Sequence, residues 1–505
     1  MPLDGFLVRI LGLAALFAAC AANAQLLPAK ADSLHSAILG QDRAVEVYLP
    51  QESAKDPAQR YETIYVLDGD WNAKIVVDIV MFMRQVGFMP PVIVVGVPNF
   101  FDANGINSRD HDLTPTVVAD QPRSGGAAAF LSFLKTELVP YIDGRYPTNG
   151  THLIHGHSFG GLFLMYALVN DPKLFDGYLI LDPAMSWDQH RLDASIESSL
   201  AGTPAKGKAI YIAARSGPAF DYMGVSAIEP IFQHKAPADL HWKITAYPDE
   251  THDSLKLKGT YDALKFAYQG YTSNAIEVLP SHGILIKGKP MLVEVGNERF
   301  DMRYTSDGSV PDASSPEVGE TLTITDPEKT TIKLLSTRGT FDRVIALKLR
   351  SGAAMVPDKR AADDGGATTW QYAFYPAQAW PKVDAGKPLA VGTTEKAMDF
   401  SQAQRDDFAG AVDRYLDVPA DGYYVFHVDS TDQARLSLSG KALIDVDASK
   451  GPREQAFVVP LQRGRYHARL VFRHASRTSD VRLTVFQCRD DEPRWWKNVL
   501  FHVSG

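Results

Sequence analysis

Cysteine is almost absent from this 505-residue chain, which has only Cys20 and Cys488. Positive charge is also in deficit, because 51 Lys and Arg stand against 60 Asp and Glu and give a net charge of −9. A chain of this charge is not drawn to phosphate backbones or anionic lipid, so we expect no nucleic-acid partner. If residues 1–24 are removed, a single cysteine remains and no disulfide can form within the mature chain.

Long apolar runs are missing after residue 24. No later segment approaches about 18 consecutive apolar residues, so we expect no transmembrane helix. Before that point, Arg9 precedes an apolar run over residues 10–19, and Ala22-Asn23-Ala24 supplies the small residues of a cleavage site. This pattern predicts a signal peptide over residues 1–24 and a periplasmic or secreted protein. Residues 17–20 loosely resemble a lipoprotein cleavage box, so an outer-membrane lipoprotein anchored through Cys20 is the alternative.

The composition is that of a folded protein, with 45% hydrophobic and 22% charged residues. Over residues 29–272, buried-strand patterns such as 63–67 and 92–97 alternate with helical stripes such as 126–139. Strands separated by helices form a mostly parallel sheet with helices on both faces. We therefore expect one α/β domain with a doubly wound sheet.

After about residue 278 the pattern changes to short alternating strands between turns rich in Gly, Asp and Ser. We expect two all-β sandwich domains, over residues 279–351 and 369–490. Residues 352–368, which include Asp363-Asp364-Gly365-Gly366, look like a linker, and residues 491–505 a C-terminal tail.

The sharpest chemical signal is Gly156-His157-Ser158-Phe159-Gly160, which matches the G-x-S-x-G nucleophile elbow. A buried-strand pattern ends at His155 and a helical pattern starts at Phe159, as that motif requires. Small residues are needed because the sharp turn brings backbone segments close together, so a Cβ on either side of the serine would obstruct it. We assign Ser158 as the nucleophile; a plain Gly-rich turn is the alternative.

A serine hydroxyl needs a base. His252 lies where the last predicted strand gives way to the last helix, which is where a triad histidine falls when the order is serine, acid, histidine. We assign His252 as the base, against the alternative of an exposed loop histidine. His155 and His157 flank the serine but are expected to pack or to line the site.

A carboxylate should orient His252. The usual place is the loop after the strand at 210–213, where the first acid is Asp221, and we assign Asp221. Asp182 at the end of the preceding strand and Glu229 are the alternatives, and a Ser-His pair without an acid stays open.

The acyl oxyanion needs two amides. Phe159 follows the nucleophile and supplies one N–H. The turn Leu67-Asp68-Gly69-Asp70-Trp71 follows an early strand, so we assign the second N–H to Asp70.

Several motifs in order resemble the esterase D and enterochelin-esterase group of α/β hydrolases. They are Tyr65 to Asp70, Pro91 to Val97, Arg109 to Pro115, Gly156 to Gly161 and the loop around His252. The group includes feruloyl and acetyl carbohydrate esterases, siderophore trilactone hydrolases and mycolyl transferases. The resemblance implies an α/β-hydrolase fold and a serine hydrolase with Ser158, His252 and the Asp70 amide in the roles given above.

Two departures from that group bear on the site. Relatives often carry a glutamate soon after the strand that precedes Asp221, but Ser216-Gly217 stands there, which leaves the acid open. Where siderophore-type members show Ser-Pro-Ser followed by tryptophans, this chain has Asp182-Pro183-Ala184-Met185-Ser186-Trp187. We expect Trp187, with Trp71 and His157, to bind substrate; a core aromatic is the alternative for Trp187.

The β segments also have likenesses. Residues 303–311 resemble the small immunoglobulin-like domain at the C-terminus of chitobiases. Residues 409–441 are similar to the protective-antigen-type β-sandwich that accompanies glycosidases and adhesins. Lectin members of that group hold calcium with paired acids, whereas only Asp432 follows Thr431 here, so the resemblance implies no calcium site. We expect no other metal or cofactor. A spacer role for both segments is the alternative to sugar binding.

These observations predict an exported serine carboxylic ester hydrolase that acts through an acyl-enzyme. The accessory segments favour acetyl or feruloyl esters on polysaccharides or oligosaccharides as substrates. This inference rests on the proteins in which such segments occur and not on the geometry of the site. A siderophore trilactone is the rival substrate, and an inert carbohydrate-binding protein is the rival class.

Overall fold

The computed structural model describes residues 28–273, 276, 278–296, 300–358, 369–377, 380, 381, 383, 387–451, 453–489 and 495–505. The predicted signal peptide, Cys20 and most of the predicted linker lie outside these residues. The chain divides into two compact units. The first ends at residue 275 and also includes residues 336–342, and the second holds residues 276–335 and 343–505.

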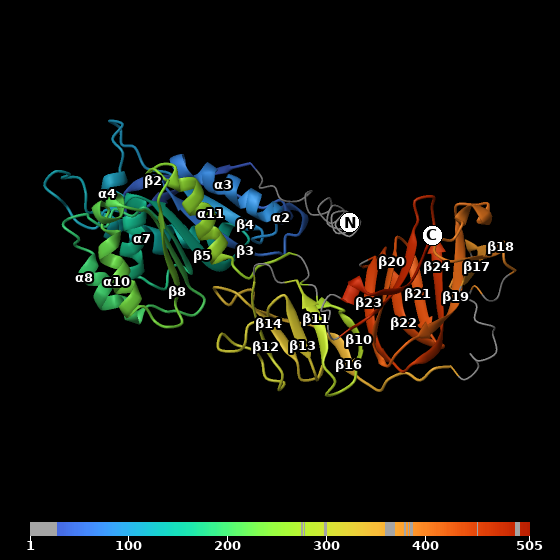
Figure 1. Cartoon of the computed structure of the whole chain (residues 1–505). Helices are drawn as coiled ribbons and strands as arrows, with labels where there is room; N and C mark the ends of the chain where they lie inside the picture. Colours follow the sequence, from blue (N-terminus) through green and yellow to red (C-terminus); the bar gives the residue numbers. More distant parts are fainter. Residues whose placement is uncertain are drawn as a thin grey trace. The chain divides into compact units, whose positions relative to one another are not determined.

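Figure 1 shows the first unit, coloured blue to green, as a sheet with helices packed around it. The sheet has eight strands in the order β1-β2-β4-β3-β5-β6-β7-β8. Strands β1 and β2 are antiparallel, β2 pairs antiparallel with β4, and the six strands from β4 to β8 are parallel. The bounds are β1 Lys30–Ser36, β2 Gln41–Tyr48, β3 Tyr61–Leu67, β4 Val92–Val97, β5 Thr148–His157, β6 Gly177–Leu181, β7 Ala209–Arg215 and β8 His241–Tyr247. The predicted mostly parallel sheet is confirmed.

Helices cover both faces of this sheet, because its central strands are apolar on both sides. One core joins α3 and α11 to strand residues such as Ile64 and Val94. The other joins α5 to α8 and α10 to residues such as Tyr65 and Ile154. The helix bounds are α2 Glu52–Lys55, α3 Gly69–Gln85, α4 Arg109–Leu113, α5 Ala127–Phe133, the π-helical η2 Leu134–Leu138, α6 Val139–Arg145, α7 Phe159–Asn170, α8 Asp193–Ser199, the 3-10 helix η3 Leu200–Gly202, α9 Pro218–Tyr222, α10 Val225–Lys235 and α11 Leu255–Ala267.

Residues 336–342 belong to the first unit although they follow the strand β14 of the second. Arg338 is buried and donates from Nη2 to Oε2 of buried Glu62 at 2.7 Å. Phe341 lies against the ring of Tyr268, at 6.1 Å between centroids. The predicted boundary at residue 272 therefore leaves out a segment that completes the packing of the first unit.

The second unit consists of β-sheets, as expected. Two six-stranded sheets have the orders β16-β10-β23-β20-β25-β26 and β18-β17-β19-β24-β21-β22, and two three-stranded sheets have the orders β13-β11-β9 and β12-β14-β15. The bounds are β9 Val278–Leu279, β10 His282–Leu285, β11 Met291–Val295, β12 Asp301–Thr305, β13 Thr321–Ile324, β14 Thr331–Leu335, β15 Arg343–Ile345, β16 Lys348–Ser351, β17 Trp370–Pro376, β18 Ala390–Thr394, η6 Phe400–Ala403, β19 Phe408–Val418, β20 Gly422–Ser430, β21 Gln433–Leu438, β22 Lys441–Asp447, β23 Glu454–Leu461, β24 Gly464–His474, β25 Val481–Gln487, η7 Trp495–Lys497 and β26 Val499–Ser504.

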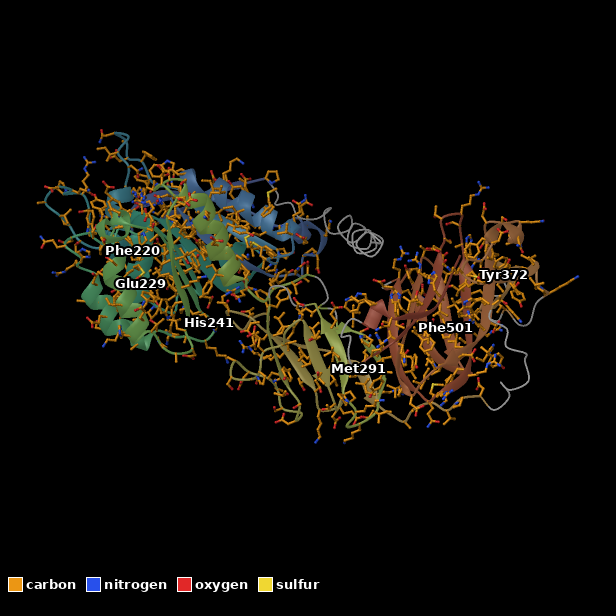
Figure 2. The ribbon with its side chains drawn as sticks, viewed as in Figure 1. Phe220, Glu229, His241, Met291, Tyr372 and Phe501 are labelled. Carbon is orange, nitrogen blue, oxygen red and sulfur yellow. The ribbon has the colours of Figure 1, made fainter. Side chains whose placement is uncertain are left out.

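These strands do not separate at the predicted linker. Strand β10 pairs in parallel with both β16 and β23, so strands from either side of residues 352–368 share one sheet. One core likewise joins Val293 to Val425 and Val458. The predicted tail also contains β26, which completes the same sheet, and Phe501 of β26 packs on the core that holds Tyr372 (Figure 2). The strands before the predicted linker and the strands after it therefore bury their apolar side chains against each other.

Among the described residues, the helices are all too short or too polar to cross a membrane.

Candidate active site

Ser158 stands at the turn between β5 and α7. Its backbone has φ 61° and ψ −116°, a conformation that costs a non-glycine residue about 1–3 kcal/mol. Hydrogen bonds hold the turn: Ser158 N–H donates to Leu181 O at 2.9 Å, and its carbonyl accepts from Leu162 at 3.0 Å and Ala184 at 3.2 Å. The predicted strand, elbow and helix are therefore all present, and the neighbouring strand β6 supports the strained residue.

The glycines around the elbow do not contribute equally. A Cβ on Gly156 would lie 2.5 Å from the carbonyl oxygen of Gly160. A Cβ on Gly160 would meet nothing closer than 3.6 Å, at Asp68 Oδ2, whereas one on Gly161 would lie 3.0 Å from Pro183 Cα. The expectation that a Cβ on either side of Ser158 is obstructed is right for Gly156 and wrong for Gly160.

His252 lies in the turn between β8 and α11, at the same edge of the sheet. Its Nδ1 donates to Asp182 Oδ2 at 2.6 Å, and the carboxylate of Asp182 is fully buried. Because a carboxylate oxygen only accepts, this bond places the Nδ1 proton and leaves Nε2 free to accept one. The geometry therefore suits His252 for general-base chemistry.

The prediction that Asp221 orients this histidine is wrong. Asp221 is an exposed residue of α9, and Glu229 lies on α10 (Figure 2), while the carboxylate on His252 comes from Asp182 directly after β6. Strand β7 ends at Arg215, and Asp221 lies six residues beyond that end, within the short helix α9. Asp182 is closer to the elbow because β6 is the direct neighbour of β5.

Asp182 is held by more than His252. Arg215 donates from Nε to the same Oδ2 at 2.6 Å and from its backbone N–H to Oδ1 at 3.2 Å. Burial alone would raise the pKa of the Asp182 carboxyl, but the hydrogen bonds from His252 and Arg215 outweigh it and hold the pKa below its ordinary value. The carboxylate is thus ionised and fixed in direction.

His157 holds the backbone of His252 through a hydrogen bond. Its Nε2 donates to the carbonyl oxygen of His252 at 2.7 Å, and the two rings lie 4.3 Å apart. Burial, followed by the repulsion from His252 and Lys256, lowers the pKa of His157 to about 3. His157 is therefore a neutral ring that positions the turn carrying His252.

Ser158, His252 and His157 line one pocket of about 340 Å³. The other lining residues are Asp68, Trp71, Asn72, Arg109, Asp253 and Lys256. Trp71 is 50% exposed, and the guanidinium of Arg109 stacks 5.5 Å from its ring. Two of the three predicted substrate-binding residues, Trp71 and His157, thus lie beside the serine.

Trp187 does not belong to this lining in the described chain. Its Nε1 donates to Thr116 Oγ1 at 3.0 Å, and its ring meets the ring of Phe159 edge-on at 5.2 Å. The tryptophan therefore packs behind the residue that follows the nucleophile.

The two amides assigned to the oxyanion both lie in the first turn of a helix, Asp70 in α3 and Phe159 in α7. Such N–H groups have no partner within the helix and carry the positive end of its dipole. Asn99 braces the first turn, since its Nδ2 donates to Asp68 Oδ1 at 3.0 Å and to Asp70 Oδ1 at 3.1 Å. Neither Asp70 nor Phe159 is among the described residues that line the pocket, and the use of both amides as oxyanion donors stays a prediction.

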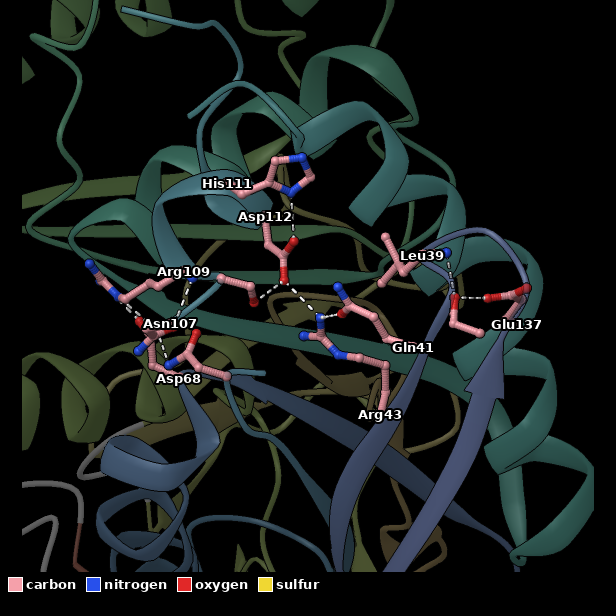
Figure 3. Close-up of polar contacts among 12 residues, drawn as sticks. Leu39, Gln41, Arg43, Asp68, Asn107, Arg109, His111, Asp112 and Glu137 are labelled. Atoms are coloured by element: carbon pink, nitrogen blue, oxygen red, sulfur yellow. Dashed lines mark hydrogen bonds and ion pairs between the residues drawn. The ribbon is translucent and has the colours of Figure 1, made fainter. Parts of the chain in front are cut away.

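Arg109 fixes the same turn from α4 (Figure 3). It donates to both carboxylate oxygens of Asp68, at 2.8 and 3.1 Å. Its helix is anchored in turn, because Asp112 accepts from Arg43 of β2 at 2.8 Å and both side chains are buried (Figure 3). The motif Arg109 to Pro115 therefore places a cation over the pocket and ties it to the sheet.

The sequence interpretation gave no role to Arg109, Arg215 or Lys256. The end of a parallel strand is the signal that could have found Arg215, because such residues meet at the catalytic edge of the sheet. Lys256 lies in the first turn of α11, directly after the loop that carries His252, and this position is the signal that could have found it.

Comparisons with known protein families match two separate parts of the chain. Residues 36–219 match the family model described as "Putative esterase", and residues 392–493 match the PA14 domain model. The first unit thus contains the region that is similar to the esterase family. The predicted resemblances to the esterase group and to the protective-antigen-type sandwich are confirmed, and the chitobiase-like segment stays a prediction.

Two curated relatives of this chain are named as esterases. The chain is 30% identical over 116 residues to the siderophore triacetylfusarinine C esterase of Aspergillus fumigatus, covering 21% of this chain and 39% of that protein. It is 26% identical over 164 residues to the ferri-bacillibactin esterase BesA of Bacillus subtilis, and this match covers 30% of this chain and 56% of that protein. The chain therefore spans about half the length of the curated relatives it matches, or less.

A solved structure of an IroE-like serine hydrolase from Shewanella oneidensis is also similar, at 30% identity and a TM-score of 0.43. The similarity covers 47% of this chain and 79% of that one.

Proposed function

We propose that this protein is a serine carboxylic ester hydrolase that forms an acyl-enzyme on Ser158. The observation that carries the proposal is one pocket holding both a serine on a strained strand-to-helix turn and a histidine that is bonded to a buried carboxylate. These are the parts that nucleophilic catalysis by a serine requires. Asp182 takes the role that the sequence interpretation gave to Asp221.

The reaction follows from these positions. Ser158 Oγ attacks the ester carbonyl carbon while His252 Nε2 takes the hydroxyl proton, and the carbonyl becomes a tetrahedral oxyanion. The C–O bond to the alcohol then breaks, and the imidazolium returns its proton to the leaving alkoxide. A water molecule next attacks the acyl-enzyme with the same base, which releases the carboxylic acid and restores the serine.

The negative charge of the oxyanion needs donors that are already in place. The N–H groups of Asp70 and Phe159 supply them at the N-termini of α3 and α7. Asp182 stabilises the imidazolium that forms at the same moment. The contacts of Asn99 and Arg109 with Asp68 keep the first of these turns rigid before substrate arrives.

For the substrate we propose the ester bond of a siderophore. The names of the curated relatives support this choice over the acetyl or feruloyl glycan esters expected from the sequence. Glycan esters stay the second candidate, because a PA14 region accompanies the esterase unit. An exported location, through the signal peptide over residues 1–24, suits either substrate.

Release of acid from a set of esters tests the proposal. The set holds a catecholate trilactone, a hydroxamate siderophore ester, acetylated xylan and a feruloylated oligosaccharide. We expect turnover of at least one siderophore ester. Ser158→Ala should lose all turnover, whereas the control Ser198→Ala, at an exposed position of α8, should keep the wild-type rate. Turnover only on the glycan esters would overturn the substrate, and full activity of Ser158→Ala would overturn the mechanism.

Any test of the role of the β unit in substrate binding must use the full chain. Removing every residue after 275 would also remove Arg338 from its bond to Glu62, so a loss of activity would not report on substrate binding.

A further inference from the structure

We propose that Arg215 is a positioning residue of the catalytic triad: it clamps Asp182 and offsets its charge, and so keeps His252 working as a base at mildly acidic pH. The inference rests on the proposed function, since it concerns how the same triad is tuned. Arg215 does not touch the reacting atoms.

The geometry that carries the proposal is the sharing of one oxygen. Asp182 Oδ2 accepts from His252 Nδ1 at 2.6 Å and from Arg215 Nε at 2.6 Å. Its other oxygen accepts from the Arg215 backbone N–H at 3.2 Å. All three bonds converge on a carboxylate that is fully buried. The carboxylate therefore has one orientation, and that orientation is set as much by β7 as by the histidine.

The charge of Arg215 matters as well as its bond. A buried carboxylate facing only a neutral imidazole would be poorly solvated and would favour taking up a proton or drawing one onto the ring. The guanidinium supplies the missing countercharge, with its side chain 23% exposed. Two donors on the same oxygen lie at most about 5 Å apart, so the guanidinium also disfavours a second positive charge on the imidazole.

The other charged groups around His252 are balanced or neutral. From β5 it faces His157, which burial keeps neutral. From α11 it faces Lys256, which is paired with Asp253 at 2.8 Å, and across the pocket Arg109 is paired with Asp68 at 2.8 Å. Arg215 is therefore the cation that acts on His252 through the triad carboxylate itself.

The rate of labelling by a fluorophosphonate, measured against pH, tests the proposal without knowledge of the substrate, because labelling of Ser158 needs the unprotonated base. The acidic limb is the part of the pH profile in which the labelling rate falls as the pH drops. In Arg215→Gln we expect this limb to move to higher pH by roughly one unit, because the charge interaction over this distance is stronger than in water and weaker than in a dry protein interior. In Arg215→Lys, which keeps the charge, we expect the limb to stay near that of the wild type and the plateau rate to fall. The control is Arg60→Gln, an exposed arginine before β3 at the opposite edge of the sheet.

The outcomes separate the two proposals. A wild-type protein that is folded but not labelled overturns the proposed function. A labelled wild type with an unmoved acidic limb in a folded Arg215→Gln overturns the role of Arg215 alone, and so does an equal shift in Arg215→Lys. In Arg215→Gln, a uniform loss of rate at all pH values together with a lower Tm would show that Arg215 supports only the fold, and thermal unfolding of each variant identifies that case.

Discussion

Replacing Asp182 by asparagine is the most informative single change, because the amide has nearly the size of the carboxylate but cannot satisfy the same donors. Asp182 Oδ2 accepts from two side chains, His252 Nδ1 and Arg215 Nε, and Oδ1 accepts from the Arg215 backbone N–H. An asparagine has one accepting atom. Whichever way it turns, its NH₂ group faces a donor, so the imidazole is left either misdirected or in the wrong tautomer.

The magnitude follows from what the carboxylate does in the transition state. It is fully buried, so its attraction for the imidazolium is little screened by water. Loss of that charge, together with the wrong tautomer, should lower kcat/KM by about 10²–10⁴-fold, or about 3–5 kcal/mol in activation free energy. The matched change Asp221→Asn removes an exposed carboxylate of α9 and should alter kcat/KM less than about twofold.

Hydrolysis of an activated ester by the wild type, Asp182→Asn and Asp221→Asn at pH 8 measures this difference. Thermal unfolding of the same samples separates a catalytic loss from a loss of fold. If Asp221→Asn proved the more damaging change, or if folded Asp182→Asn kept its full rate, the assignment of Asp182 would be refuted.

Three further predictions concern the first unit. Arg338→Met leaves the buried carboxylate of Glu62 without its partner and should destabilise this unit by about 3–5 kcal/mol; an unchanged Tm would contradict the buried pair. Gly156→Ala should abolish labelling of Ser158, because its Cβ would lie 2.5 Å from a carbonyl oxygen, whereas Gly160→Ala has room and should be tolerated; equal effects would show that the elbow is not this tight. His155 and His157 have pKa values lowered by burial to about 4 and about 3, so below about pH 6.5 the unfolded chain binds protons that the folded one does not. Stability measured by urea unfolding should therefore fall as the pH drops from about 6.5 towards 4, and stability that stays level over that range would argue against two neutral buried histidines.

The parallel sheet and the nucleophile could be predicted from the sequence because each depends on local pattern. Strands buried on both faces, such as β3 and β4, are apolar throughout, and the elbow needs Gly156 two residues before the serine. His252 could be placed in the same way, by the change from strand to helix.

The acid could not be chosen from the sequence because its selection depends on which strands are neighbours. Asp182 and Asp221 both follow strands, and only the order β5-β6-β7 shows that the end of β6 lies next to the elbow. The position of Arg215 at a strand end could mark it as a candidate, but its bond to Asp182 could not be assigned for the same reason, since it depends on the distance between the ends of two strands.

The β region shows the same limit on a larger scale. Strands β10 and β16 precede the predicted linker, yet they join β23 in one sheet, and β26 lies in what looked like a tail. Pairing between distant strands leaves no trace in local alternation. Arg338 is a further case, because nothing near it in the chain indicates that its partner is Glu62.

The most direct test of the central claim is the site of covalent modification after a fluorophosphonate reacts with the full chain. The account predicts one adduct per chain, found by mass spectrometry on the peptide that contains Ser158, and its absence in Ser158→Ala. An adduct on any other residue, or none on a protein shown to be folded, would contradict the claim that Ser158 is the nucleophile.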